Sequence, residues 1–511
     1  MGAWTRRAFL GTSAVGGLPL LTELGALGQL DQASAQIARF DPAGVRPTPS
    51  IKALVGLIHK TPHEQCVAIF IQQLRDGLSY QDFLAALFLA SIEQGDPHYV
   101  AAVYSAHRVA SEAAATERLL PLFWALDRLS RGFAQDPPKP RSLLESESKS
   151  ATSELDFRNS MEQGDSEKTA AALIALSQDR GPRQALSLLW EYSARRVDGT
   201  LGHHPIMMAN SWRTLEALGW GLNEPVLRYL ATSFSGDEAD RCYQVNRERA
   251  AQAVGNLPAS WAKRTPARFA TLEVYRQLRE GHTDATLEHV NGELVAGRVS
   301  AGAIWDAIHL AAADLLFRYR TGGLTIGGFL IHSVTGTNAL RYGFETCADD
   351  RVRFLLLLQA IPLIGDLFIH EGRKEDDLRP LDLAELQVSA SGKRLSMDDI
   401  FAILPTKMAE PREDDRGASR DRSDEACRAA FALLQSEDGQ AHFQQYARSL
   451  LCRKATDNPH DFKYPVAAFE DVSLVSPDWR PYLLAASVHA LHGVASPDAK
   501  VLIQAKAALA S

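Results

Sequence analysis

The sequence predicts an all-α protein: one large multi-helix domain of packed antiparallel helices with no sizeable sheet, in a bundle or a solenoid-like stack. Apolar residues recur at three- and four-residue steps, for example at Leu84, Leu87, Phe88 and Ile92. The alternation of apolar and polar residues that is typical of strands is scarce. No fixed-period repeat indicates a named solenoid.

The composition is that of a globular protein. Hydrophobic residues make up 46% of the 511 residues and charged residues 23%, which excludes wholesale disorder. The net charge of −8, from 62 acidic and 54 basic residues, argues against a protein that binds nucleic acid or an anionic membrane surface. The five cysteines lie far apart without a CxxC pair, which disfavours a zinc ribbon, a covalently attached haem and a disulfide scaffold.

Residues 1–35 predict a twin-arginine signal peptide. The segment TRRAFL at residues 5–10 is followed by a weakly apolar, glycine-rich run and by the small-x-small sequence ASA at residues 33–35. An amphipathic first helix is the alternative. We therefore expect the chain to engage the twin-arginine export machinery and to be periplasmic or secreted. The next most apolar run, residues 354–369, is interrupted by polar residues and predicts a buried helix, so no membrane span is expected after signal removal.

Polarity divides the rest of the chain. Residues 137–168 are polar, with prolines first and charges after, and predict an exposed linker or loop. Residues 405–424 are densely charged and predict a solvated loop. An N-terminal helical region (36–136), a main helical region (169–404) and a C-terminal helical region (425–511) remain.

Histidine is the residue type that points to chemistry, because the chain has 15 histidines and no cysteine cluster. In the segment GHHPIMM at residues 202–208, Pro205 suits the first turn of a helix, which places His203 and His204 at its N-terminal entry. The helix dipole disfavours imidazolium there, so His204 is expected to be neutral and able to bind a metal or accept a proton. A histidine that only caps the helix at the surface is the alternative.

Asp306 and His309 lie on or beside one apolar helical stripe. A carboxylate and an imidazole at this spacing resemble a ligand pair of di-iron bundles. A core His309 held by Asp306 is the alternative, which is favoured because Asp-x-x-His is common by chance.

The third segment, residues 327–340, opens a helix with two glycines. His332, Gly336, Ala339 and Gly343 share one face, which is almost bare beyond the imidazole. Glycine in a helix interior costs roughly 0.5–1 kcal/mol relative to alanine, so packing or binding must offset it. We favour room for a flat ligand beside His332 over close helix packing.

A fourth segment, residues 457–465, is bounded by prolines. His460 and Lys463 would present a base and a cation together there, with Tyr464 nearby; a turn with incidental charges is the alternative. No spacing distinguishes further histidines such as His98, His107, His282, His289 and His370.

Two of these segments resemble the questin oxidase-like family. Residues 331–341, IHSVTGTNALR, look like that family's LHxVTxxxALR stretch, and residues 458–463, NPHDFK, are similar to its later DxHxxK segment. His204 followed by Ile206 looks like an earlier FHxLI helix start. The matches occur in the family's order.

The resemblance implies an all-helical, oxygenase-like enzyme. The best-known members of the family carry out Baeyer–Villiger-type ring opening of anthraquinones in fungal polyketide pathways, with NADPH implicated. By position, His204, His332 and His460 would be the counterparts of the family's histidines, with Lys463 beside the last. This chain differs from the family in its export signal, its extra N-terminal helical region and its charged insertions. An exported protein has no ready supply of NADPH.

Two classes of function follow. The first is an exported, all-helical, oxygenase-like oxidoreductase with a histidine-lined site for a small organic substrate, metal-containing with iron or copper, or metal-free with acid/base catalysis. The second is a non-catalytic helical ligand- or protein-binding protein of the cell envelope. The candidate catalytic residues are His332, His460 and Lys463, and the candidate metal ligands are His204, Asp306, His309, His332 and His460. Convergence of these histidines in space is itself a prediction.

Overall fold

The computed structural model describes residues 45–137, 153–197, 199–319, 329–369, 378–388, 395–406 and 413–510. The predicted signal peptide, residues 1–35, lies outside the described residues. Within them, every regular element is a helix, and the β contact that occurs is an isolated bridge between Tyr319 and Leu378. The all-α prediction is confirmed.

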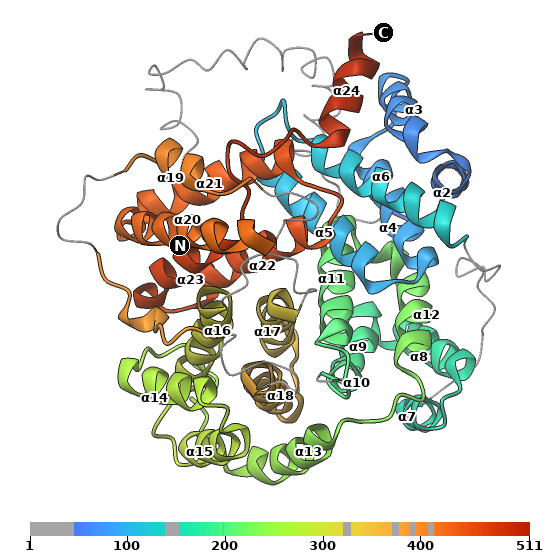
Figure 1. Ribbon diagram of the computed structural model, residues 1–511. Coiled ribbons are helices and arrows are strands. Elements are labelled where there is room, and N and C mark those ends of the chain that lie inside the picture. The colour runs from blue at the N-terminus through green and yellow to red at the C-terminus, as the bar shows by residue number, and fades with distance from the viewer. Residues whose placement is uncertain are drawn as a thin grey trace, which may run out of the picture.

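Figure 1 labels the helices in chain order. The first five are α2 (Pro49–Lys60), α3 (His63–Arg75), α4 (Tyr80–Gln94), α5 (Pro97–Glu112) and α6 (Leu120–Gln135). The middle of the chain forms α7 (Glu154–Glu162), α8 (Ser166–Arg180), α9 (Pro182–Ser187), α10 (Leu189–Ser193), α11 (His203–Leu218), α12 (Asn223–Phe234), α13 (Arg241–Ala253), α14 (Arg268–Arg279), α15 (Thr283–Val295), α16 (Ala301–Arg318), α17 (Phe329–Thr346) and α18 (Asp350–Ile369). The last are α19 (Met397–Ile403), α20 (Glu413–Leu433), α21 (Glu437–Lys454), α22 (His460–Leu474), α23 (Arg480–Ser487) and α24 (Lys500–Ala510).

The second half of the predicted linker at 137–168 is helical. Ser153 and Asp156 form a capping box at the start of α7. The side chain of each residue accepts a hydrogen bond from the backbone N–H of the other. Phe157 and Met161, four residues apart, are buried and anchor the helix to the core. The polar composition of α7 therefore belongs to an amphipathic surface helix, and the loop prediction is wrong from Ser153 onward.

The predicted solvated loop at 405–424 is also helical from Glu413, where α20 begins. Arg420 and Asp424, one helical turn apart, are buried instead of solvated. Arg379 forms an ion pair with Asp424, and Arg420 donates to the Leu316 carbonyl oxygen at 2.9 Å. These charges are buried because each has a partner, which composition alone does not reveal.

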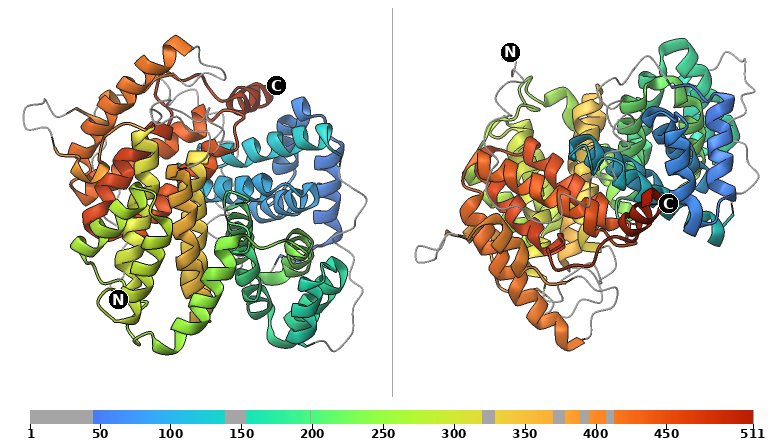
Figure 2. Two further views of the ribbon diagram at one scale, coloured as in Figure 1. Left: turned by 60° about the horizontal axis from the view of Figure 1, so that its bottom comes forward. Right: turned by 90° about the horizontal axis from the view of Figure 1, so that it is seen from above.

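The three predicted helical regions share one hydrophobic core, whose buried residues run from Val45 to Leu509. Helix α24, near the C-terminus, packs on α3 and α6 near the start of the described chain, as Figures 1 and 2 show. The helices therefore close into one body, and the N-terminal region is built into it.

Four helices from distant parts of the chain form the centre of this body. Helix α5 packs on α11, α11 on α17, α17 on α22, and α22 on α5. This closed ring of four contacts places the N-terminal ends of the helices together, and the candidate functional site lies there.

Candidate metal centre

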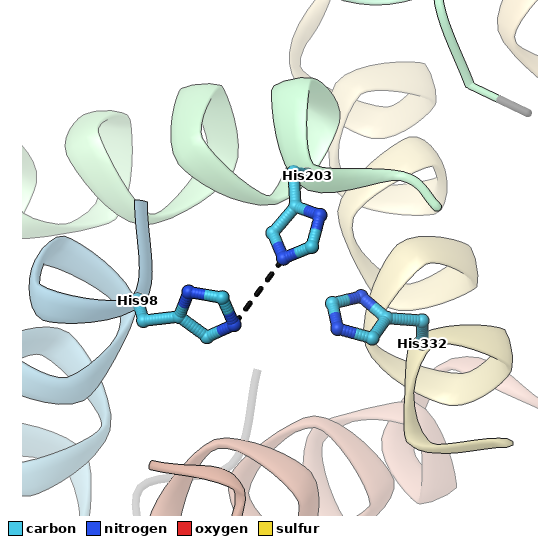
Figure 3. A group of neighbouring side chains, drawn as sticks. All are labelled: His98, His203 and His332. Atoms are coloured by element: carbon cyan, nitrogen blue, oxygen red, sulfur yellow. Dashed lines mark hydrogen bonds between the residues drawn. The ribbon is translucent and has the colours of Figure 1, made fainter. Parts of the chain in front are cut away.

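Four histidines meet where the four central helices begin. His98 is the second residue of α5, His203 opens α11, His332 is the fourth residue of α17, and His460 opens α22. Neighbouring rings are close, with centroid separations of 4.8 Å for His98–His203, 4.3 Å for His203–His332, 5.5 Å for His332–His460 and 5.6 Å for His98–His460. Figure 3 shows His98, His203 and His332 directed from three helices toward one space. We call the four side chains the histidine cluster.

Hydrogen bonds fix how three of these rings present their nitrogens. His98 Nδ1 lies 2.7 Å from the Asp96 carboxylate, His460 Nδ1 lies 2.8 Å from the Asn458 side-chain oxygen, and His203 Nδ1 contacts the Thr200 carbonyl oxygen. These oxygens only accept hydrogen bonds, so each Nδ1 carries the proton and donates. The Nε2 atom of each of the three rings therefore has a free lone pair.

Two of these nitrogens lie close together. His98 Nε2 and His203 Nε2 are 3.3 Å apart, the contact that the dashed line in Figure 3 marks. If both rings are neutral and protonated at Nδ1, neither has an N–H to place between them, and a shared cation removes the repulsion of the two lone pairs. With metal–nitrogen bonds of about 2.1 Å, donors at this separation subtend about 105° at the metal, close to tetrahedral. One ring nitrogen from each of His98, His203 and His332 lies within 4.8 Å of the other two, and such a group could hold a metal ion after a small movement of the rings.

The surroundings keep the imidazoles of His203, His332 and His460 neutral, the form that binds metals. Burial, with positive charge on Lys463 as the next cause, lowers the pKa of His203 to about 4 and that of His460 to about 2. The same two causes hold the pKa of His332 far below its usual value. The positive ends of the four helix dipoles act in the same direction.

Lys463 lies one turn after His460 on α22 and is only 3% exposed. Its Nζ atom, His332 Nδ1 and His460 Nε2 are all buried without a hydrogen-bond partner. Burial lowers the pKa of Lys463 to about 7. Burying a polar group without a hydrogen-bond partner costs about 1–3 kcal/mol of folding free energy. Three such groups in one cluster therefore favour a site that a ligand completes over a purely structural cluster.

Close helix packing brings the rings together. Gly202 precedes α11 with a φ of +74°, and a Cβ atom there would lie 3.2 Å from the Gly336 Cα atom on α17. A Cβ atom on Gly336 would lie 2.8 Å from Leu363, and one on Gly343 would lie 2.7 Å from Trp190. Neighbouring helices therefore pack directly on the glycine-containing face of α17. Our prediction of room for a flat ligand on that face is wrong.

Three predicted metal ligands lie elsewhere. His204 Nδ1 is 3.4 Å from Asp237, and its ring packs on Phe234. Successive residues of a helix are turned by about 100°, so His203 faces the cluster and His204 does not.

Asp306 and His309 have separate partners. Asp306 accepts hydrogen bonds from Ser476, and His309 Nδ1 lies 3.3 Å from Asp471. Neither joins the histidine cluster, and the interpretation of His309 as held by Asp306 is also wrong. The structure does bring together His332, His460 and Lys463, the three residues predicted as catalytic.

His98 is the residue that sequence reasoning missed, although a signal existed. Asp96-Pro97-His98 and Asn458-Pro459-His460 share the pattern Asx-Pro-His. In both, the Asx oxygen accepts from the histidine backbone N–H as well as from Nδ1. The pattern therefore caps a helix and fixes an imidazole at its first turn.

A second polar layer crosses the four central helices farther from their N-terminal ends. Tyr104, Arg213, Asn338 and Glu470 lie six or ten residues beyond the four histidines, about 9 or 15 Å along the helices. Tyr104 donates to Glu470 at 2.6 Å, and Arg213 donates to Asn338 at 2.8 Å. The four helices thus run in the same direction away from the histidine cluster. A cleft of about 460 Å³ opens at this layer and contains none of the four histidines.

No family model, curated protein or solved structure matches the chain. Among the described helices, none is both long and apolar enough to cross a membrane.

Proposed function

We propose that this protein is an exported, metal-dependent oxidoreductase, oxygenase-like, that acts on a small organic substrate at the histidine cluster. His98, His203 and His332 would bind iron or copper, and His460 and Lys463 would lie beside the reacting atoms. The observation that carries the proposal is the 3.3 Å contact between the Nε2 atoms of His98 and His203, within a group of three histidines that could hold a metal ion.

The donor set supports a transition metal. Three neutral imidazoles suit zinc, copper, iron and nickel, whereas magnesium and calcium prefer oxygen ligands. Each N–H that orients a ring comes from Nδ1 and reaches an oxygen two or three residues earlier, as is common for metal-binding histidines. The choice of a redox metal rests on the resemblance to the questin oxidase-like family, whose two best matching segments supply His332, His460 and Lys463.

Lys463 is suited to proton transfer, and His460 is suited to orienting a substrate. His460 Nε2 has a lone pair and no hydrogen-bond partner, so it can accept a hydrogen bond from a substrate. Lys463 has a pKa lowered to about 7 and can donate or accept a proton near neutral pH. The metal would supply Lewis-acid or one-electron chemistry. No role in this proposal depends on NADPH.

The buried, unpartnered Lys463 amine also favours a second candidate, metal-free acid/base catalysis by Lys463 and His460. Metal content separates the two.

The test is the metal content and visible spectrum of the full chain, purified after export, beside His332→Ala. We expect close to one equivalent of iron or copper in the parent protein and loss of both metal and colour in the variant. A matched control is His289→Ala, a histidine outside the cluster near Glu273, which should retain the metal. A colourless, metal-free parent protein would refute the metal and leave acid/base catalysis or a non-catalytic binding protein.

A further inference from the structure

The charge of the proposed centre is unbalanced. Its three candidate ligands are neutral imidazoles, so a divalent metal would keep its full charge in a partly buried site. The nearby carboxylate of Asp96 is half-exposed and already accepts two hydrogen bonds from His98. On the His460 side, Asp461 is occupied by Thr456 and His492.

The helices that surround the site add positive potential. Four helix N-termini meet there, and their first backbone N–H groups lack partners within the helix. Asp96 caps α5, and the Asn458 side chain accepts the His460 backbone N–H at the start of α22, but no side chain caps α11. An anion beside the histidine cluster would meet at least this uncapped end.

Lys463 is an independent indication of an anion. Its amine is buried, lacks a hydrogen-bond partner, and is the leading charge acting on His203, His332 and His460. Asp96, the opposite charge that acts on it, also interacts with Arg128 and with His98. A buried ammonium without a counter-ion is costly, so an anionic ligand would satisfy it.

We propose that the substrate of this centre carries a carboxylate, which binds the metal through one oxygen and pairs with Lys463 through the other. The inference rests on the proposed metal site and goes beyond it by naming the substrate class. The carboxylate supplies the negative charge that the histidine ligands do not, and the uncapped N-terminus of α11 favours the same charge.

The test uses the full chain loaded with Co²⁺, whose visible bands report its ligands. Titration with acetate should change these bands saturably, whereas acetamide, a neutral molecule of the same shape, should not. In Lys463→Met, Co²⁺ should bind as before while acetate binds at least about tenfold more weakly, since a charge-assisted hydrogen bond contributes about 1.5–3 kcal/mol. Lys168→Met, which removes a surface ammonium, should behave like the parent protein.

The outcomes separate this inference from the proposed function. If the visible bands of bound Co²⁺ change with neither acetate nor acetamide, or equally with both, the proposal of a carboxylate substrate is overturned and the metal site stands. Acetate binding that is unchanged in both Lys463→Met and Lys463→Gln removes Lys463 from the site and overturns the pairing. If neither variant folds, the comparison of acetate with acetamide in the parent protein decides whether the site prefers a carboxylate. Failure of Co²⁺ to bind at all overturns the metal site and this inference together.

Discussion

Asp96→Ala tests whether the hydrogen bonds behind the histidines serve the proposed metal site. The Asp96 carboxylate caps α5 by accepting the His98 backbone N–H at 2.8 Å and also accepts from Nδ1 of the same residue. Loss of the cap should lower the free energy of unfolding by about 1 kcal/mol. Loss of the Nδ1 acceptor frees the ring to rotate, and such outer contacts typically contribute 10- to 100-fold to metal affinity.

The assays are urea unfolding of the metal-free protein and metal titration against a competing chelator. Asp96→Asn keeps an oxygen acceptor in the same place and should retain most of the metal affinity. Ser79→Ala removes the cap of α4 away from the histidines, so it should lower stability by a similar amount and leave metal affinity unchanged. The reasoning is refuted if Asp96→Ala behaves like Ser79→Ala in both assays.

Three further changes test the packing and the charges around the site. Gly202→Ala should destabilise the protein by more than about 1 kcal/mol in urea unfolding, because φ is +74° and the new Cβ atom would meet Gly336. Burial lowers the pKa of His107 to about 4, so the unfolded chain takes up the proton first. Stability should therefore be full above about pH 6.5 and fall by up to about 3 kcal/mol toward pH 4, a loss that His107→Gln should reduce. Asp424→Asn should cost roughly 3–5 kcal/mol, because it leaves the buried Arg420 and Arg379 without their counter-charge.

Each of these has a contradicting result. A Gly202→Ala protein as stable as the parent would show that the α11–α17 contact is not tight. An identical pH dependence in His107→Gln would assign the acid sensitivity to other groups. An Asp424→Asn protein within about 0.5 kcal/mol of the parent, as expected for a surface change, would show that Asp424 and Arg420 are solvated.

The fold was predictable because burial imposes a helical period that the sequence displays directly. The two wrong loop assignments share one cause. Residues 153–162 and 413–424 are polar in composition, yet a helix needs only a few well-placed anchors, such as Phe157 and Met161. Composition reports how much of a helix faces solvent and does not report whether the segment is a helix.

The site was predictable in part. His332, His460 and Lys463 stood out because each lay in a segment with unusual glycine or proline spacing. Choosing His203 over His204 required knowing the direction of α17 relative to α11, which depends on the contact between Gly202 and Gly336. His98 lies more than a hundred residues from the next member of the cluster, so only the Asx-Pro-His pattern indicated it.

Metal affinity of His203→Ala compared with His204→Ala tests the central claim most directly. The two residues are adjacent and both open α11, so helix propensity and capping change alike. We expect the metal affinity of His203→Ala to fall by more than about 100-fold, since a direct ligand should exceed the effect of an outer contact, and that of His204→Ala to stay close to the parent value. Equal losses in both variants, or a loss in His204→Ala alone, would contradict a metal held by His98, His203 and His332.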